Sequence, residues 1–203
     1  MKIIGHELEK TNQPSFIFGT PIWHFQRDLP KGAVEWALNV QKNSKRMVNG
    51  SGRGGYQSDP SYDFFEIPFI DHIQEQFKDF PLFKFGNWWV NIQDKGDYNL
   101  HHTHPYSDLV VIWYLTDNNG TTFLHNPYAF LRDKLRRVMP QSVQDVSFTS
   151  YDYSGGTFIN AKAGDFIVFP SDVVHEVREH KFDSTRISVS FNLNIPSSIE
   201  DIK

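Results

Sequence analysis

The first part of the chain alternates short apolar stretches with polar ones. Residues 14–30 contain two brief apolar runs and predict an N-terminal strand. Apolar residues recur at helical spacing in 31–43 and again in 68–79, so each segment predicts an amphipathic helix. Residues 44–62 are rich in Gly, Ser, Asn and Asp and predict a loop. A surface loop of this length is more often functional or disordered than merely connective.

From residue 82 onward the pattern changes to short segments of β-branched and aromatic residues between turn residues. An insertion over 126–156 interrupts this pattern, and within it Tyr128–Val138 could form a helix. Several short strands after two helices favour a mainly β fold, a sandwich or barrel with a flank of N-terminal helices. The predicted strands are 87–92, 109–115, 121–124, 165–169 and 186–193.

The length and composition narrow this picture further. A chain of 203 residues predicts one domain, with a helical flank over about 1–80 and a β core over about 82–195. The formal charge of −4 gives no electrostatic reason to expect a nucleic acid or an anionic membrane as partner. The longest wholly apolar run, Leu109–Leu115, is too short to cross a bilayer, and the charged N-terminal segment is unlike a signal peptide. We therefore expect a soluble, cytoplasmic protein.

Cysteine is absent, whereas the chain has nine histidines. Thiolate zinc sites and cysteine-ligated iron–sulfur clusters are thereby excluded. Any metal must be held by imidazole, carboxylate or backbone oxygen.

Three of these histidines lie in the segment 99–105. If this segment is extended, residues two apart share a face, so His102 and His104 point together while His101 faces the other way. His175, which follows a predicted strand and its turn, is the candidate partner on a facing strand. Neutral imidazoles suit iron, zinc, copper and nickel. The pattern favours a metal site, although surface or structural histidines would also explain it.

The last predicted strand alternates polar and apolar residues without a break. Arg186, Ser188, Ser190 and Asn192 share one face. A half-buried strand with its polar face in water explains this alternation. Arg and Ser two residues apart also form an anion clamp, because the guanidinium binds a carboxylate through two hydrogen bonds and the hydroxyl adds a third donor. His175 lies 11 residues before Arg186, which is enough for a strand, a turn and a return.

Short motifs follow one another in a specific order from about residue 16 to residue 193. They are Phe18–Trp23, Gly54–Ser58, Trp89–Asn91, Gly96–Asn99, His102–Pro105 with Ser107, Gly120 with Phe123 and Pro127, Gly164–Asp165, Phe169–Ser171, His175 and Arg186–Asn192. In this order and spacing the chain resembles the small, prolyl-hydroxylase-like 2-oxoglutarate–Fe(II) oxygenases of bacteria and phages.

The resemblance implies a double-stranded β-helix, also called a cupin-like jelly roll, with Fe(II) near its open mouth. By position, His102 and His175 would be iron ligands, and His104 stands where the wider superfamily carries an aspartate. Arg186 and Ser188 would hold the distal carboxylate of 2-oxoglutarate. Asn91 and Tyr114 would hydrogen-bond the same co-substrate from neighbouring strands.

The implied reaction is an O₂-dependent hydroxylation of an amino-acid side chain, free or in a peptide, in which 2-oxoglutarate is converted to succinate and CO₂. The Gly-rich loop 47–58 and the insertion 126–156 would flank the mouth and select the substrate. The partner would be a small molecule or a peptide, and a homodimer stays open. A phage-encoded protein of this kind would act in the host cell. Residues expected to contact the substrate are Gly54, Tyr56, Gln57 and Trp113, and the aromatic walls would include Trp89 and Phe169.

Two further interpretations remain open. Three histidines without a carboxylate can also hold a cupin-like metal centre that uses no keto acid, or a zinc ion that activates water. Alternatively, the chain is a jelly-roll binding module without catalytic activity. The presence of all three histidines together with Arg186 favours an active site.

Overall fold

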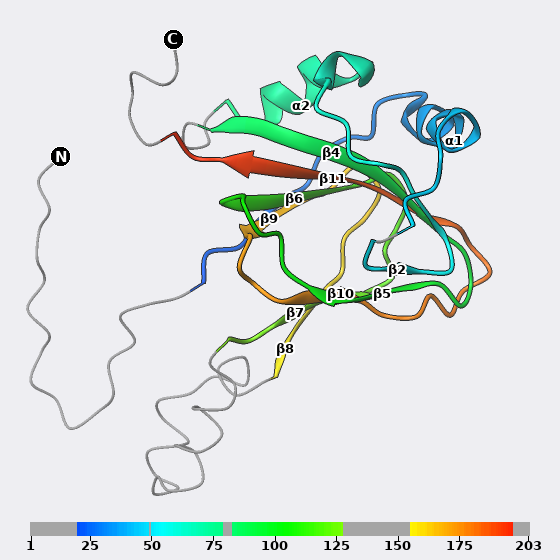
Figure 1. Ribbon diagram of the computed structural model, residues 1–203, viewed down its shortest axis with the longest axis vertical. Coiled ribbons are helices and arrows are strands. Elements are labelled where there is room, and N and C mark those ends of the chain that lie inside the picture. The colour runs from blue at the N-terminus through cyan, green and yellow to red at the C-terminus, as the bar shows by residue number, and fades with distance from the viewer. Residues whose placement is uncertain (1–19, 49, 79–82, 128–154, 197–203) are drawn as a thin grey trace, which may run out of the picture.

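Two antiparallel β-sheets face one another, and two helices lie on the outer side of the larger sheet (Figure 1). The computed structural model describes residues 20–48, 50–78, 83–127 and 155–196. The strands are β1 (Trp23–Phe25), β2 (Gly52–Arg53), β3 (Tyr56–Gln57), β4 (Lys84–Gln93), β5 (Tyr98–His102), β6 (Leu109–Tyr114), β7 (Thr122–His125), β8 (Gly156–Ile159), β9 (Phe166–Pro170), β10 (His175–Val177) and β11 (Arg186–Asn194).

The larger sheet has the strand order β1-β9-β6-β11-β4-β3, and the smaller sheet has the order β2-β5-β10-β7-β8. Neighbouring strands of the larger sheet come from distant parts of the sequence, and the long strand β11 pairs with both β4 and β6. The mainly β jelly roll predicted from the sequence is therefore confirmed.

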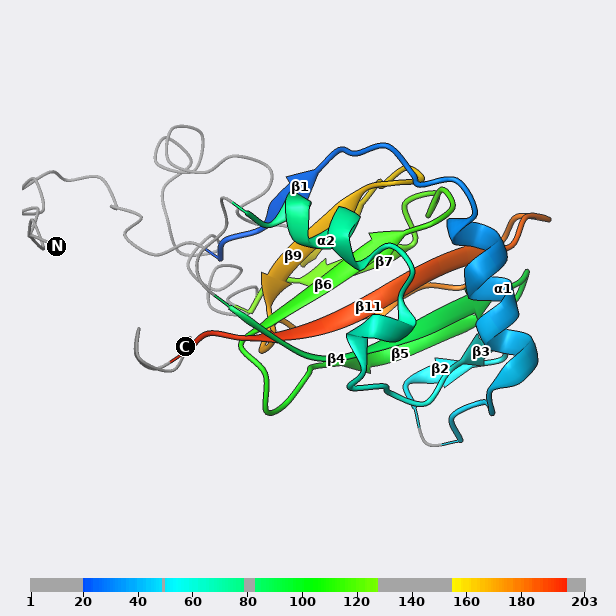
Figure 2. The same cartoon turned by 90° about the horizontal axis from the view of Figure 1, so that it is seen from above.

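The helices cover the outer face of the larger sheet, as the view from above shows (Figure 2). Helix α1 (Ala33–Asn43) matches the expected helix 31–43, and α2 (Ile70–Gln76) is shorter than the expected 68–79. A 3-10 turn at Phe64–Glu66 precedes α2 and is capped by the Asp63 side chain, which accepts a hydrogen bond from the backbone N–H of Phe65.

The two faces of the larger sheet have different environments, and the alternation along β6 and β11 decides which side chain faces where. The odd-numbered residues of both strands point toward the helices and pack with Ala33 and Ala37 of α1 in one core cluster. Val110 and Ile112 of β6 point the other way, into the space between the sheets. Both faces of β6 are therefore buried.

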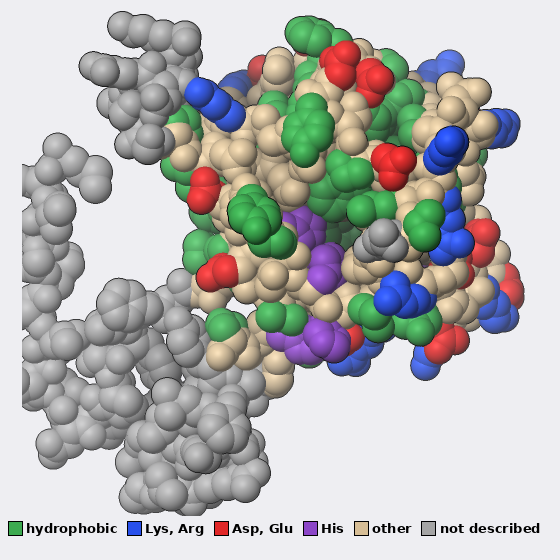
Figure 3. All heavy atoms as spheres, viewed as in Figure 1, with side chains coloured by type: hydrophobic (Ala, Val, Ile, Leu, Met, Phe, Trp, Pro, Cys, Tyr) green, Lys and Arg blue, Asp and Glu red, His purple; other side chains and the backbone are tan. Residues whose placement is uncertain are grey.

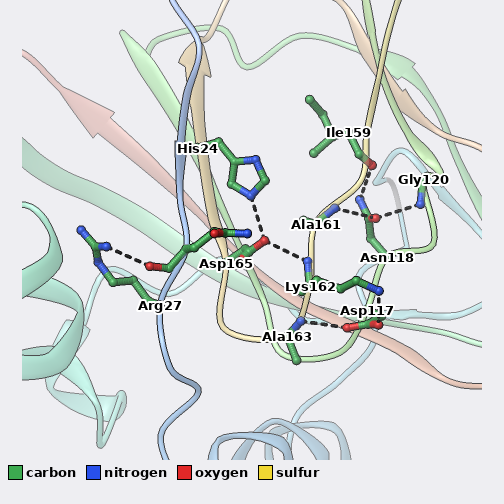
Figure 4. Close-up of polar contacts among 11 residues, drawn as sticks. His24, Arg27, Asp117, Asn118, Gly120, Ile159, Ala161, Lys162, Ala163 and Asp165 are labelled. Carbon is green, nitrogen blue, oxygen red and sulfur yellow. Dashed lines mark hydrogen bonds and ion pairs between the residues drawn. The ribbon is translucent and has the colours of Figure 1, made fainter.

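One end of the β-structure is held by polar residues of two turns (Figure 4). The buried Asn118 side chain accepts hydrogen bonds from the backbone N–H groups of Gly120 and Ala161 and donates one to the carbonyl of Ile159. Asp165 accepts a 2.9 Å hydrogen bond from the N–H of Lys162 and lies 2.8 Å from His24 Nε2 on β1. These contacts join the β6–β7 turn to the β8–β9 turn and attach β1.

Several sequence predictions need correction. The segment 44–62 is not wholly loop, because it contains β2 and β3, which pair with β5 and β4. Strands β5, β8 and β10 were not predicted as strands; β8 lies at the end of the proposed insertion 126–156, and β10 begins at His175. The N-terminal strand is limited to Trp23–Phe25 in the part described. The proposed helix Tyr128–Val138 lies outside the described residues.

Within the described residues, no helix is both long and apolar enough to cross a membrane.

Candidate metal and co-substrate site

Three histidines converge between the two sheets. His102 ends β5 and His175 begins β10, and the two are direct partners in the antiparallel register. His104 follows two residues after the end of β5, where its backbone N–H donates to the carbonyl of Ser171. One ligand nitrogen from each of the three rings lies within 4.8 Å of the other two. The structure thus brings together the three residues that the sequence singled out.

Each of these rings has its Nδ1 next to a hydrogen-bond acceptor. His102 Nδ1 lies 2.7 Å from the carbonyl oxygen of Leu100, and His175 Nδ1 lies 2.9 Å from that of Val173. His104 Nδ1 lies 2.7 Å from Oδ1 of Asn192. Acceptors at all three Nδ1 atoms place the proton there and leave Nε2 with its lone pair. Three oriented imidazole nitrogens are therefore available as ligands.

The Asn192 amide is itself oriented, because its Nδ2 donates a 2.8 Å hydrogen bond to Oδ1 of Asn87 on β4. This contact turns Oδ1 of Asn192 toward His104. The polar face of β11 and its partner on β4 thereby set the tautomer of a candidate ligand.

The environment keeps the three imidazoles neutral. Burial lowers the pKa of His175 to about 3 and that of His104 to about 4, and it also lowers the pKa of His102. The neighbouring imidazoles add to this effect for His175 and His104, since each disfavours a positive charge on the other. Unprotonated rings are the form that binds a metal.

A buried guanidinium lies on the same cavity wall. Arg186 is 3% exposed, and no carboxylate of the described residues lies within ion-pair distance of it. Its Nε and Nη2 donate to Oε1 of Gln93 at 3.1 and 2.6 Å, and Nη1 donates to Oγ1 of Thr121. Burial lowers the pKa of Arg186 to about 10, so it remains charged at neutral pH. A buried charge with only neutral partners is a site for an anion.

The cavity between the sheets connects these groups. It is lined by all three histidines and Arg186, and also by Ser188, Asn91 and Tyr114, which the resemblance assigned to the co-substrate. Tyr114 donates a 3.0 Å hydrogen bond to Thr122, and Asn91 donates one of 3.2 Å to Ser190. The polar face of β11 thus faces a cavity rather than bulk water.

A wider cleft opens outward from His102 and His104. On this face of the molecule, histidine side chains lie beside a hollow that is bordered by hydrophobic side chains (Figure 3). Trp89 forms part of the wall, and its ring centroid is 5.3 Å from that of His104. Gln57 lines the same cleft. Two of the expected substrate-side residues, Trp89 and Gln57, therefore lie at the mouth.

The other expected substrate-side residues lie elsewhere. Trp113 is fully buried on the helix-facing side of β6, where it stacks on Phe166 with a centroid distance of 5.4 Å, so the prediction that it faces the substrate is wrong. Tyr56 packs in the same core, and its hydroxyl contacts Ser44. Gly54 has a φ of 75° in the turn between β2 and β3, beside a separate small cleft.

Phe169 is buried between the sheets, with its ring 4.8 Å from that of His175. Phe169 therefore packs against the His175 ring and does not line the cavity.

Four polar residues of the site were missed by the sequence reasoning: Gln93, Thr121, Asn99 and Ser51. Gln93 continues the inward-facing series of Trp89 and Asn91, so extending the alternation beyond the predicted strand end would have found it. Asn99 and Ser51 show no comparable signal, because their positions depend on the pairing of β2 with β5.

The histidine set fits a divalent first-row metal. Three neutral nitrogen donors, each fixed by a second hydrogen bond, are a donor set that iron, nickel, copper and zinc accept. With three protein ligands, about three positions of an octahedral metal stay open for other ligands.

The fold and the site define a class: a double-stranded β-helix with three clustered histidines and a buried arginine on the wall of one cavity. The model of the family described as "Putative 2OG-Fe(II) oxygenase" matches residues 87–192, which is more than half of the chain and includes all three histidines and Arg186. The chain therefore belongs to this 2-oxoglutarate–Fe(II) oxygenase family. Its cofactors are those of the family: Fe(II), 2-oxoglutarate and O₂. No curated protein sequence matches the chain.

Solved structures of low sequence identity share the fold. HygX from Streptomyces hygroscopicus, solved with nickel and 2-oxoglutarate, is 13% identical with a TM-score of 0.53, and the match covers 88% of this chain and 84% of HygX. The viral collagen prolyl hydroxylase of Paramecium Bursaria Chlorella virus-1, a 2-oxoglutarate complex, is 15% identical with a TM-score of 0.53 (85% and 94% covered). A prolyl hydroxylase from Trichoplax adhaerens, bound to a peptide fragment of hypoxia inducible factor, is 11% identical with a TM-score of 0.56 (86% and 83% covered).

Proposed function

We propose that this 2-oxoglutarate- and Fe(II)-dependent oxygenase hydroxylates an amino-acid side chain, free or within a peptide. The observation that carries the proposal is the placement of three neutral imidazoles and one buried, carboxylate-free guanidinium on the walls of a single cavity. A keto acid with a second carboxylate matches this pair of sites, because one end can chelate a metal while the other neutralises Arg186.

The overall reaction balances as substrate, O₂ and 2-oxoglutarate giving hydroxylated substrate, succinate and CO₂. When bound, the metal supplies the activation of O₂ that this oxidation needs. His102, His104 and His175 would hold the metal through Nε2. Arg186 and Ser188 would bind the distal carboxylate, with Asn91 and Tyr114 beside it.

The apolar residues of the cavity have a separate task. Val110 and Ile112 lie on the wall opposite the smaller sheet and keep water away from the reacting groups. Trp89 stands at the boundary between this cavity and the outer cleft. A substrate group in the outer cleft would lie beside this tryptophan and beside His102 and His104, which line the same cleft.

The lining of the outer cleft supports an uncharged substrate group. Its described residues include no Asp, Glu, Lys or Arg, and they combine apolar surface with neutral hydrogen-bonding groups. Apolar walls with a few polar groups are typical of sites that orient a neutral ligand. Members of this set are Met47, Pro60, Trp89, Leu100 and Pro105 on the apolar side and Gln57, Asn87 and Asn192 on the polar side.

The test begins with anaerobic protein, Fe(II) and 2-oxoglutarate. We expect the visible charge-transfer band of the chelate and, once O₂ is admitted, succinate. Arg186→Gln should raise the 2-oxoglutarate concentration needed for the band, whereas His175→Ala should remove metal binding. His101→Ala, one residue from His102 but exposed, is the matched control and should leave the metal affinity and the charge-transfer band unchanged.

Metal binding with neither a band nor succinate would reject the proposal and favour the cupin-like alternative. Absence of both metal and 2-oxoglutarate binding would instead indicate a non-catalytic module. A panel of free amino acids and peptides, compared by succinate formed above the uncoupled rate, tests the substrate class.

A further inference from the structure

A chain of hydrogen bonds runs from Arg186 to His102 through three neutral side chains. Gln93 is the cross-strand partner of Arg186 in the β4–β11 register, and its Oε1 accepts two hydrogen bonds from the guanidinium. Gln93 Nε2 donates to Oδ1 of Asn99, and Asn99 Nδ2 donates to Oγ of Ser51 at 3.0 Å. Ser51 Oγ lies 3.5 Å from Nε2 of His102.

The direction of every bond in this chain is determined at its two ends. A guanidinium only donates, so Oε1 of Gln93 must face Arg186 and its Nε2 must face away. Because Nε2 of Gln93 donates to Oδ1 of Asn99, the Nδ2 group of Asn99 must face Ser51. At the other end, the proton of His102 is on Nδ1, next to the Leu100 carbonyl, so Nε2 accepts from the Ser51 hydroxyl. The chain has no competing orientation.

These three residues come from three different segments. Gln93 is the last residue of β4, Asn99 lies in β5, and Ser51 precedes β2 in the loop beside the mouth. An irregularity in the β5–β10 pairing lets Asn99 face the same cavity as His102, although the two are three residues apart. The chain of bonds therefore connects both sheets and the mouth loop.

We propose that Gln93 and Asn99 are positioning residues that hold the Arg186 guanidinium ready for a dicarboxylate, and that Ser51 links this clamp to the metal site. This inference rests on the proposed use of 2-oxoglutarate. Gln93 is a neutral acceptor, so it adds no negative charge beside Arg186, yet its two hydrogen bonds fix the plane of the guanidinium. Without it, Thr121 would be the one remaining hydrogen-bond partner of the Arg186 side chain among the described residues, and the guanidinium would have to find a new orientation before binding.

The same geometry gives Ser51 a second state. If Nε2 of His102 held a metal, it would no longer be available as the acceptor of the Ser51 hydroxyl. Since Ser51 lines both the inner cavity and the outer cleft, its O–H is then free to donate to a ligand there. Occupation of the metal site thus changes the hydrogen bonding of the mouth loop.

The first measurement uses Gln93→Met, which keeps the side-chain length and removes all three hydrogen bonds of the Gln93 amide, two with Arg186 and one with Asn99. In anaerobic Fe(II) protein, the 2-oxoglutarate concentration for half of the charge-transfer band should rise about tenfold, as expected for lost hydrogen bonds to a charged group. Affinity for Mn(II) alone, measured by calorimetry, should stay within about twofold, because Gln93 contacts none of the three histidines. Gln74→Met, on the exposed side of α2, is the matched control and should leave both values unchanged.

Asn99→Ala is the second variant, in case Gln93→Met does not fold. It leaves the contacts of Arg186 in place but frees the Gln93 amide to turn, so a smaller rise, about threefold, is expected. If the 2-oxoglutarate concentration for half of the charge-transfer band is the same in wild type and in both variants, the proposal is overturned. An equal loss of Mn(II) and 2-oxoglutarate binding would also overturn it, because that result indicates a merely structural role.

A ligand-free measurement separates this inference from the proposed function. The Nε–H signal of Arg186 in a ¹H–¹⁵N spectrum, assigned by its loss in Arg186→Lys, should be protected from exchange in wild type and in Gln74→Met. In Gln93→Met it should exchange rapidly. If this holds while wild type shows no band with 2-oxoglutarate, the positioning chain stands and the proposed function fails. A signal that is equally protected in Gln93→Met would overturn the chain itself.

Discussion

His102 and His175 are directly opposed residues on the antiparallel strands β5 and β10, and their ring centroids are 4.3 Å apart. Both strands are short, with five and three residues, and each places its histidine at the end nearer the cavity. A pair of neutral rings at this spacing gains little from direct contact. Under the proposed function, the two rings would instead serve as ligands of the same metal ion.

Loss of one ring of this pair should therefore abolish tight metal binding. In His175→Ala, only His102 and His104 remain, and we expect Fe(II) or Mn(II) affinity to fall by at least about 100-fold. Calorimetric titration of the anaerobic protein measures this directly. The His101→Ala variant should bind as wild type, and retention of wild-type affinity in His175→Ala would exclude the proposed ligand set.

The second hydrogen bond of His104 leads to another prediction. Replacing Asn192 by Leu removes the acceptor that holds the Nδ1 proton, so the ring can turn or change tautomer. Metal affinity should fall about 10- to 100-fold, the usual cost of losing such a partner. Asn194→Leu, at the exposed end of the same strand, is the control. Equal affinities in the two variants would show that the Asn192 contact does not matter.

The regular alternation of β11 made its polar face predictable from the sequence. The period of two identifies the four residues on that face, and their types, together with the histidines, predict an anion clamp beside a metal site. Periodicity alone left open whether the face meets water or a cavity. The second sheet decides this, and two of its strands, β2 and β10, consist of only two and three residues.

The apolar run of β6 shows the opposite case. Every residue of Leu109–Tyr114 is buried, because helices cover one face of the strand and the second sheet covers the other. No alternation remains to indicate direction, so Trp113 and Tyr114 were both expected at the cavity although neighbours in a strand face opposite ways. The contacts of Ser51 were equally beyond reach, since they depend on tertiary pairing of a two-residue strand.

The buried histidines should make the metal-free protein sensitive to acid. Burial sets the pKa of His104 at about 4 and that of His175 at about 3 in the folded state, against 6.5 for the unperturbed group. Between these values the unfolded chain binds protons that the folded chain does not, so the free energy of unfolding rises with pH. The contribution of the two neutral imidazoles to the free energy of unfolding is fully present above pH 6.5. It is lost progressively as the pH falls toward the folded-state pKa values of His104 and His175.

The slope of the free energy of unfolding against pH can be measured by urea unfolding in the presence of a chelator, at several pH values from 7.5 to 5. This slope gives roughly the number of protons taken up on unfolding. His175→Asn should reduce the slope, whereas His101→Asn, which alters an exposed ring, should not. If the free energy of unfolding depends on pH with the same slope in wild type and His175→Asn, the assignment of acid sensitivity to the buried histidines is contradicted.

The two tryptophans on opposite faces of the larger sheet should respond differently to the same substitution. Trp113 is fully buried against Phe166, so Trp113→Leu should lower the free energy of unfolding by about 2–4 kcal/mol through lost packing. The 2-oxoglutarate concentration for half of the charge-transfer band should not change in the folded fraction, because Trp113 faces the helices. Trp89→Leu should cost less stability, since its ring borders open space, but it should raise the KM of an amino-acid or peptide substrate. Chemical denaturation and steady-state kinetics on both variants separate the two effects. A changed substrate KM in Trp113→Leu with unchanged stability would reverse the assignment of the two faces.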